Sequence, residues 1–202
     1  GIEDNSTNLK DKLQKTKINH TSFVSNVKDM EITMSDGKKI KTNYTIIATE
    51  PTNLVEGLKG QKVDWKSCQN LYFTCSSRVY EKAFIGLVSN QECLINNIFY
   101  PTSIPTSKKG KDELISVTVV KDHGLTEKEL IERVKNELKK ECKIEGVNFL
   151  KLYNIPKALP KLNNLQYDIT PSETKLKDGI FLAGDLLLNG SLNAAILACL
   201  LY

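Results

Sequence analysis

A carboxylate and a capped helix follow a short apolar run near the end of the chain. Ile180 to Ala183 is apolar enough to form a buried strand, and Gly184 and Asp185 follow at once. Further along, Ser191 is a natural N-cap for a small apolar helix that runs to Leu201. A carboxylate after a buried strand, next to a helix N-terminus, is typical of a nucleotide-cofactor site.

The first amides of this helix would act as hydrogen-bond donors, because they lack partners inside the helix and carry about half a positive charge. They suit a group that becomes negative, such as the N1/O2 edge of a reduced flavin. Asp185 suits a ribityl or ribose hydroxyl, since a carboxylate accepts hydrogen bonds. Ala194, Ala195 and Ala198 would let a flat ring approach the helix. The alternative is a buried strand-turn-helix whose alanines only pack against a neighbour, and these residues alone leave both readings open.

The strands that must position this site come from both ends of the chain. Tyr44 to Ala48 is a second apolar run, expected to form a buried strand that ends at Thr49-Glu50-Pro51. Before it, alternating residues predict strands over Thr21 to Asn26, Met30 to Met34 and Lys39 to Lys41, with a hairpin turn at Ser35-Asp36-Gly37. Leu9 and Leu13 suggest a short amphipathic helix.

The middle of the chain is richest in β-forming residues. Four strands are expected, over 70–75, 83–88, 93–100 and 113–120, with an exposed loop over 101–110. Thr126 and Glu129 form a capping box, which predicts a helix that ends around Cys142. A strand over 149–155 and a polar connection over 162–177 complete the chain. The pattern predicts an α/β (α+β) fold in which a mixed sheet is inserted into a cofactor layer.

Composition narrows the classes of function. The chain has 202 residues, of which 40% are hydrophobic and 26% charged, and its net charge is +4. These values are typical of a globular domain, and lysines scattered among acids do not form a nucleic-acid track. No apolar run is long enough to span a bilayer. Five cysteines without C-x-x-C spacing indicate reduced thiols in an intracellular protein. Both ends, Gly1 and Tyr202, look like cuts in a longer protein.

Four segments together resemble the C-terminal half of flavin-dependent amine-oxidase-like and carotenoid-desaturase-like oxidoreductases. They are 23–27 before the Ser-Asp-Gly hairpin, 44–51, 153–160, and 179–185 continuing through 190–195. The stretch 96–100 followed by 113–120 looks most similar to the plant and cyanobacterial branch. The resemblance implies that 1–55 and 161–202 are an incomplete FAD-binding Rossmann-like layer, and that 56–160 is a substrate domain. That domain would form much of a chamber for an apolar or amine-bearing substrate.

The resemblance also implies roles for individual residues in binding FAD. The backbone of Val24 would meet the adenine, and the end of the Tyr44 strand would lie against the dinucleotide. Asp185 would hold the ribityl or pyrophosphate region, and two amides of the last helix would face the flavin N1/O2 edge. The implied cofactor-binding residues are Val24, Ala48, Thr49, Glu50, Gly184, Asp185, Ser191, Leu192 and Asn193.

The chain also departs from the family pattern. The glycine-rich G-x-G-x-x-G turn belongs to an N-terminal segment that this sequence does not contain, and that segment is an expected partner. Leu186, Leu187 and Leu188 are more apolar than the usual continuation after the aspartate. No catalytic side chain, zinc site or paired histidine is evident, but in flavoenzymes the cofactor performs the redox step. The alternative is a non-catalytic, flavoenzyme-like subunit of a larger assembly.

Overall fold

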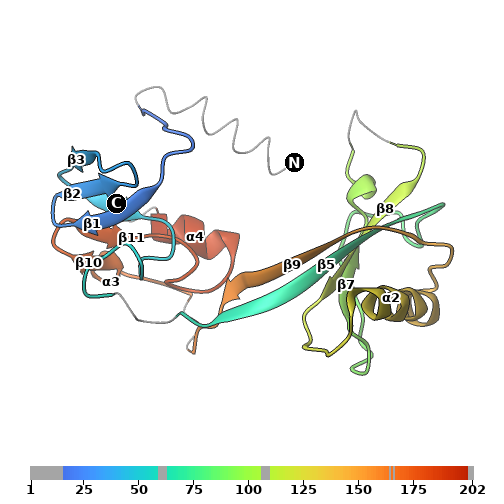
Figure 1. Cartoon of the computed structure of the whole chain (residues 1–202). Helices are drawn as coiled ribbons and strands as arrows, with labels where there is room; N and C mark the ends of the chain where they lie inside the picture. The colour runs from blue at the N-terminus through green and yellow to red at the C-terminus, as the bar shows by residue number, and fades with distance from the viewer. Residues whose placement is uncertain (1–15, 59–62, 106–109, 164, 166, 200–202) are drawn as a thin grey trace. The chain divides into compact units, whose positions relative to one another are not determined.

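The computed structural model describes residues 16–58, 63–105, 110–163, 165 and 167–199. The chain forms two compact units: Gly1–Lys62 with Asn164–Tyr202, and Val63–Asn163. Both contain sheets and helices, so the predicted α+β class is confirmed (Figure 1). No helix among the described residues is long and apolar enough to cross a membrane. The helix expected around Leu9 and Leu13 lies outside the described residues.

The first unit begins with a three-stranded antiparallel sheet. Its strands are β1 (Val24–Lys28), β2 (Glu31–Met34) and β3 (Lys39–Lys41), in that order. Gly37 adopts a positive φ of 85° in the hairpin between β2 and β3, a conformation that glycine reaches without strain. The amide of Met34 donates to the carbonyl of Lys38 at 2.8 Å. The hairpin and its flanking strands were predicted correctly because turn chemistry and alternation are local signals.

A second sheet joins the two ends of the chain. It has the order β10 (Lys175–Lys177), β11 (Ile180–Leu182) and β4 (Thr45–Ile47), and β11 pairs with β4 in parallel. The side chains of Val27, Ile47, Val55 and Ile180 form a buried cluster between the two sheets. The strands expected around Tyr44 and Ile180 therefore form one layer, as the apolar runs indicated.

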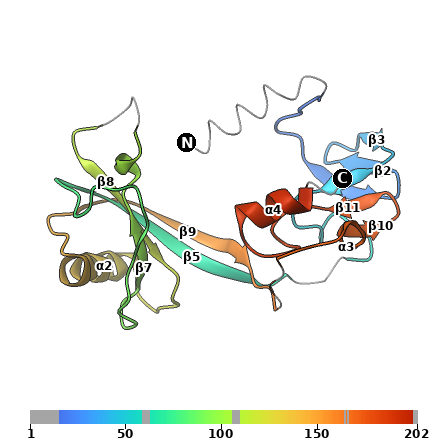
Figure 2. The same ribbon diagram turned by 180° about the vertical axis from the view of Figure 1, so that it is seen from behind.

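Two helices complete the first unit, as Figure 2 shows. Helix α3 (Pro171–Thr174) and strand β10 lie within a segment expected to be a polar connection, so that part of the prediction was wrong. A capping box between Thr170 and Glu173 is the signal that was missed. Helix α4 (Leu192–Cys199) begins at the predicted N-cap, where the Oγ of Ser191 accepts the amide of Ala194 at 3.2 Å.

The second unit is built on a five-stranded sheet with the order β6-β7-β8-β5-β9. Every pair in it is antiparallel, so the sheet is not the mixed one that was expected. The strands are β5 (Trp65–Cys75), β6 (Gly86–Leu87), β7 (Ile95–Phe99), β8 (Glu113–Val119) and β9 (Asn148–Pro160). A short 3-10 turn, η1 (Pro101–Ser103), follows β7. Strand β6 is shorter than expected, and β9 is longer because it continues through Pro156. Its pairing with β5 is irregular there, between Ile155 and Leu159, and proline is tolerated at such places and on edge strands.

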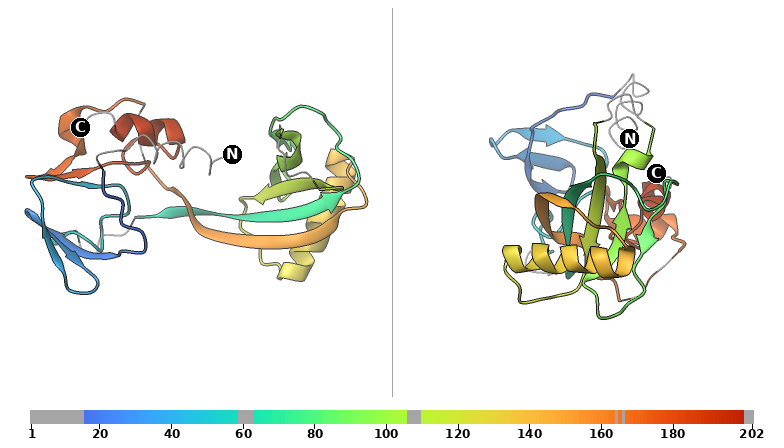
Figure 3. Two further views of the ribbon diagram at one scale, coloured as in Figure 1. Left: turned by 90° about the horizontal axis from the view of Figure 1, so that it is seen from above. Right: turned by 90° about the vertical axis from the view of Figure 1, so that its right-hand side faces the viewer.

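One face of this sheet is covered by α2 (Glu127–Cys142), as Figure 3 shows. The helix has the predicted capping box, and Leu130, Val134 and Leu138 face the sheet. These side chains pack with buried residues of β5 and β8, such as Phe73 and Val117. Because alternate residues of a strand point to opposite faces, the other half of each strand lies on the face away from α2.

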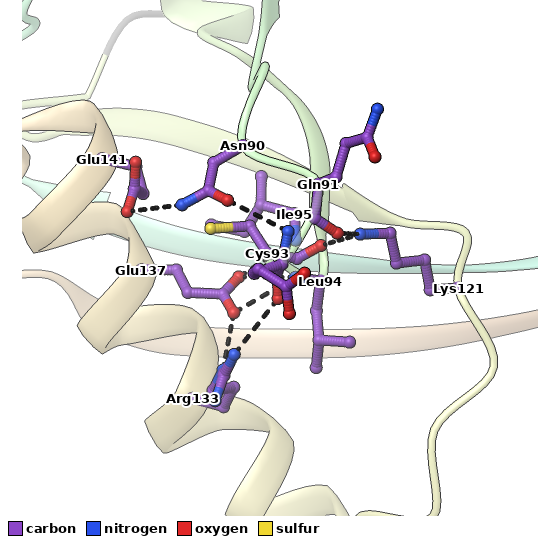
Figure 4. Close-up of polar contacts among 10 residues, drawn as sticks. Asn90, Gln91, Cys93, Leu94, Ile95, Lys121, Arg133, Glu137 and Glu141 are labelled. Carbon is purple, nitrogen blue, oxygen red and sulfur yellow. Dashed lines mark hydrogen bonds and ion pairs between the residues drawn. The ribbon is translucent and has the colours of Figure 1, made fainter.

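A buried carboxylate also attaches α2 to the start of β7 (Figure 4). The side chain of Glu137 accepts the backbone amides of Leu94 and Ile95 at 2.9 and 3.1 Å. The Nε of Arg133 donates to the same carboxylate at 2.6 Å. Burying a charge is unfavourable unless such partners compensate for lost solvation, so these contacts account for an acid inside the fold.

Candidate functional site

The two parallel strands of the first unit bring the predicted site residues of both chain ends to one edge. Ile47 lies opposite Leu182, and the amide of Ala183 donates to the carbonyl of Ile47 at 2.9 Å. Beyond this pair the chain continues as Ala48-Thr49-Glu50 after β4 and as Gly184-Asp185 after β11. The carboxyl ends of parallel strands are where ligands bind in α/β sheets, because the connecting loops leave a crevice there.

Gly184 makes the sharp turn at the end of β11. Its φ is +115°, a conformation that other residues adopt only with strain, and no atom lies within 4 Å of the position where a Cβ would stand. A side chain at this position would project into open space beside the strand ends. The glycine therefore keeps the backbone bare at the edge where a ligand would lie.

The start of α4 is open to solvent. Leu192 is 73% exposed, and Ser191 and Asn193 are exposed as well. The amides of Ala194 and Ala195 are bonded to Ser191, whereas those of Leu192 and Asn193 have no hydrogen-bond partner among the described residues. Two donors at the positive end of a helix are thus available to an acceptor outside the protein.

The acids of the edge differ in their surroundings. Asp185 is half-buried, and its carboxylate makes no hydrogen bond within the described part of the chain. Glu50 accepts the hydroxyl of the buried Thr52 at 3.0 Å, which fixes the chain where it leaves β4. Asp185 is therefore the acid with acceptor capacity left for a hydroxyl of a bound molecule.

Val24 lies on β1, in the sheet that packs against these strands. Its half-buried side chain contacts the cluster of Val27, Ile47 and Ile180, and the amide of Val27 donates to the carbonyl of Leu54 at 2.7 Å. Like Val24, the other eight predicted cofactor-binding residues belong to the first unit. The structure places Val24 against this cluster, and its contact with an adenine stays a prediction.

The strand around Tyr44 is not buried on both faces as expected. Ile47 is 4% exposed, but Ile46 is 51% exposed, and Tyr44 is exposed as well. The ring of Tyr44 lies 6.2 Å from that of Phe181 on the same side. The apolar run predicted burial because parallel strands are usually covered on both faces, whereas only one face of β4 is covered by the described residues.

The apolar continuation after Asp185 has a packing role. Leu188 is buried with Ile169 and Ala194, and Leu187 packs against this cluster. These contacts hold the loop before α4 against the helix. Two of the three leucines that motivated the non-catalytic alternative, Leu187 and Leu188, therefore pack within this unit, and the alternative itself stays untested.

No activated nucleophile is present among the described cysteines and histidines. Burial raises the pKa of the Cys68, Cys75 and Cys93 thiols, and raises that of Cys142 to about 11, so these groups stay protonated. His123 contacts the side chain of Gln69 at 2.6 Å and accepts the amide of Leu125 at 3.3 Å, which makes it a turn histidine. These contacts suit structural roles.

Sequence reasoning missed a polar cluster in the second unit. On the sheet face away from α2, the side chain of Asn70 bonds to the hydroxyls of Tyr72 and Ser116. The alternation within β5 was the available signal, since Leu71 and Phe73 are its buried positions. Only the pairing of strands far apart in sequence brings Ser116 next to Asn70 and Tyr72.

No protein-family model matches the chain, and no curated protein sequence matches it. Solved structures of oxidoreductases do have the same fold. A proposed protoporphyrinogen oxidase from Exiguobacterium sp. 255-15 superposes with a TM-score of 0.66 at 14% identity, over 98% of this chain and 49% of that one. An oxidoreductase from Methanosarcina mazei superposes with a TM-score of 0.59 at 12% identity, over 89% of this chain and 48% of that one. For iminodiacetate oxidase from Chelativorans sp. BNC1 the TM-score is 0.54 at 13% identity, over 91% of this chain and 48% of that one.

The chain spans about half the length of each of these structures. At such low identity the likeness shows the fold, which agrees with the oxidoreductase family that the four sequence segments resemble. The plant and cyanobacterial branch stays a prediction, as do the substrate and the whole protein's activity.

Proposed function

We propose that this chain is the C-terminal portion of an FAD-dependent oxidoreductase acting on a small substrate. The observation that carries the proposal is the shared edge of β4 and β11, which leads into Ala48 and Thr49 on one strand and into the bare turn at Gly184 and the acceptor Asp185 on the other. The exposed amides of α4 belong to the same unit. When bound, FAD would supply the redox chemistry by accepting a hydride from the substrate.

The residues of the first unit would bind and orient the cofactor. Val24 would meet the adenine, Ala48, Thr49 and Glu50 would line the dinucleotide, and Asp185 would accept a ribityl or pyrophosphate-proximal hydroxyl. The amides of Leu192 and Asn193 would donate to the N1/O2 edge and favour its reduced, negative form. The segment with a glycine-rich turn would complete the site as part of the same protein.

The exposed side of β4 supports a missing layer. In the neighbouring structures an equal length of chain lies outside the match, and parallel strands are usually covered on both faces. Ile46 lies on β4 and Tyr44 directly before it, and the outer edge of β4 has no strand paired to it among the described residues. A further strand and helix from the glycine-rich segment would cover them.

The test is FAD uptake by the protein expressed with its upstream coding sequence. We expect a yellow protein whose flavin absorbance persists after gel filtration. A colourless protein that takes up no added FAD would contradict the proposal. If that protein co-purified with stable partners, the non-catalytic alternative would be favoured.

A further inference from the structure

In the second unit, a substrate could contact only the sheet face that α2 does not cover. Helix α2 fills the other face with Leu130, Val134 and Leu138, which are fully buried against it. A chamber wall made by this sheet must therefore use the positions that alternate with Leu71 and Phe73. Six of these positions, on neighbouring strands, matter here: Asn70, Tyr72, Ser116, Thr118, Lys151 and Tyr153.

Strand pairing places these side chains side by side. Tyr72 lies opposite Ser116 on β8 and opposite Lys151 on β9, while Asn70 lies opposite Tyr153. The rings of Tyr72 and Tyr153 are 5.9 Å apart in an edge-to-face arrangement, and the Nζ of Lys151 is 6.0 Å from the centre of the Tyr153 ring. The face is thus an aromatic surface with a polar centre and a cation at its side.

Among the described residues, the hydrogen bonds of the centre leave one hydroxyl proton and the second N–H of Asn70 without a partner. The hydroxyl of Ser116 donates to the Oδ1 of Asn70 at 2.9 Å, and the Nδ2 of Asn70 donates to the hydroxyl of Tyr72 at 3.1 Å. Tyr72 accepts in this chain of bonds, so its own O–H proton points elsewhere. If the amide of Asn70 is turned over, Ser116 and Tyr72 exchange roles and the free proton belongs to Ser116. Either arrangement leaves one hydroxyl proton available to an acceptor outside the described residues.

An unpaired hydroxyl donor limits which ligands can bind over this face. A pure hydrocarbon that expelled water from the face would leave the hydroxyl unpaired, and burying an unpaired polar group is unfavourable. A ligand with an acceptor restores the bond. Lys151 is the only charged side chain of the six, and it lies next to Tyr72, so an anionic acceptor gains an attraction that a neutral one lacks.

We propose that this face binds the carboxylate of a planar, unsaturated substrate, with the Tyr72–Asn70–Ser116 cluster donating the hydrogen bond and Lys151 supplying the charge. The assignment rests on the proposed function, because the face is a substrate wall only if the chain is part of such an oxidoreductase. Under this proposal the substrate carries an acid group and is not a purely apolar molecule such as an unsubstituted polyene.

The test uses 2-naphthoate and naphthalene as probes, titrated into the full-length protein and followed by tyrosine fluorescence or calorimetry. We expect naphthoate to bind more tightly than naphthalene. The double variant Tyr72→Phe/Ser116→Ala should lower naphthoate affinity about 10- to 100-fold, the usual range for losing a hydrogen bond to a charged group. The two single variants report which hydroxyl holds the proton.

Matched measurements separate recognition from folding. The double variant should bind naphthalene within about twofold of the original protein, and Tyr167→Phe, at a tyrosine that is 80% exposed in the other unit, should change neither affinity. Lys151→Gln should weaken naphthoate binding and remove most of its salt dependence. Equal binding of the two probes, no binding of either, or an unchanged double variant would overturn the proposal.

FAD uptake, measured separately by absorbance, distinguishes the two proposals. A protein that binds FAD without preferring naphthoate retains the proposed function and loses this substrate class. A protein that prefers naphthoate through Tyr72 or Ser116 but takes up no FAD retains the carboxylate site and loses the flavoenzyme proposal.

Discussion

Ile47 and Leu182 lie opposite each other in the parallel strands β4 and β11. Ile47 belongs to the N-terminal part of the chain and Leu182 to the C-terminal part, and the whole second unit separates them in the sequence. Their pairing places the turn at Gly184 next to the residues that follow β4. The candidate cofactor site therefore depends on a contact between segments that are far apart in sequence.

The two neighbouring isoleucines of β4 should respond differently to truncation. Ile47→Ala removes a buried side chain from the cluster with Val27 and Ile180, and should lower the free energy of unfolding by about 3 kcal/mol. Ile46→Ala should cost about 1 kcal/mol or less in the 202-residue chain, because Ile46 is largely exposed. Urea denaturation measures both values.

The same pair tests the proposal that a further strand and helix cover β4. With the upstream coding sequence included, the cost of Ile46→Ala should rise to about 2 kcal/mol if a further strand and helix cover that side of β4. An equally small cost in the longer protein would show that nothing packs on Ile46.

The amide of Leu192 can be removed without disturbing the helix. Proline is favoured at the first position of a helix, so Leu192→Pro should keep α4 folded while deleting one exposed donor. We expect about tenfold weaker FAD binding and a lower reduction potential, since the reduced flavin gains most from that donor. Ile196→Ala, at an exposed position of the same helix, is the control and should alter neither. Unchanged binding and potential in Leu192→Pro would place the flavin edge elsewhere.

The buried acid of α2 should be important for stability. Glu137→Ala leaves the amides of Leu94 and Ile95 without an acceptor, and should reduce the free energy of unfolding by about 3 kcal/mol. Glu132→Ala provides the matched loss of an exposed acid on the same helix, where its ion pair with Lys135 is worth about 0.5 kcal/mol or less. Thermal or urea unfolding of the two variants compares them. Similar costs would show that the buried contacts contribute little.

The capping box of α2 should make stability depend on acid pH. The carboxylate of Glu129 accepts the backbone amide of Thr126 at 2.8 Å and its hydroxyl at 2.7 Å, and these bonds lower the pKa of Glu129. A carboxyl whose pKa is lower in the folded state stabilises the fold above its unfolded pKa of about 4.3. That contribution is lost as pH falls from there through the lower folded value.

Glu129→Gln should therefore flatten the fall of stability below about pH 4.3, since glutamine retains an acceptor but does not titrate. Glu127→Gln is the control, because Glu127 lies in the first turn without the reciprocal bonds to Thr126. Urea unfolding at several pH values gives both curves. Identical slopes in Glu129→Gln and the original protein would exclude a role of the box in acid sensitivity.

Local signals in the sequence predicted much of the fold. The hairpin at Gly37, the capping box at Thr126 and the N-cap at Ser191 were placed correctly, because each depends on a few neighbouring residues. The strand β10 was missed because Lys175–Lys177 is short and polar, and it becomes a strand only through its pairing with β11. The exposure of Ile46 was missed because an apolar run does not show how many layers cover it.

The sequence by itself determined the hairpin at Gly37 and the caps that begin α2 and α4. It also marked Gly184, Asp185 and Ser191 as a group that suits a cofactor. Tertiary structure alone decided that the ends of β4 and β11 meet, and that α2 leaves the face with Asn70, Tyr72 and Ser116 open. The physical reason is range: caps and turns are set by hydrogen bonds between neighbours, whereas strand partners and covered faces are set by burial between distant segments.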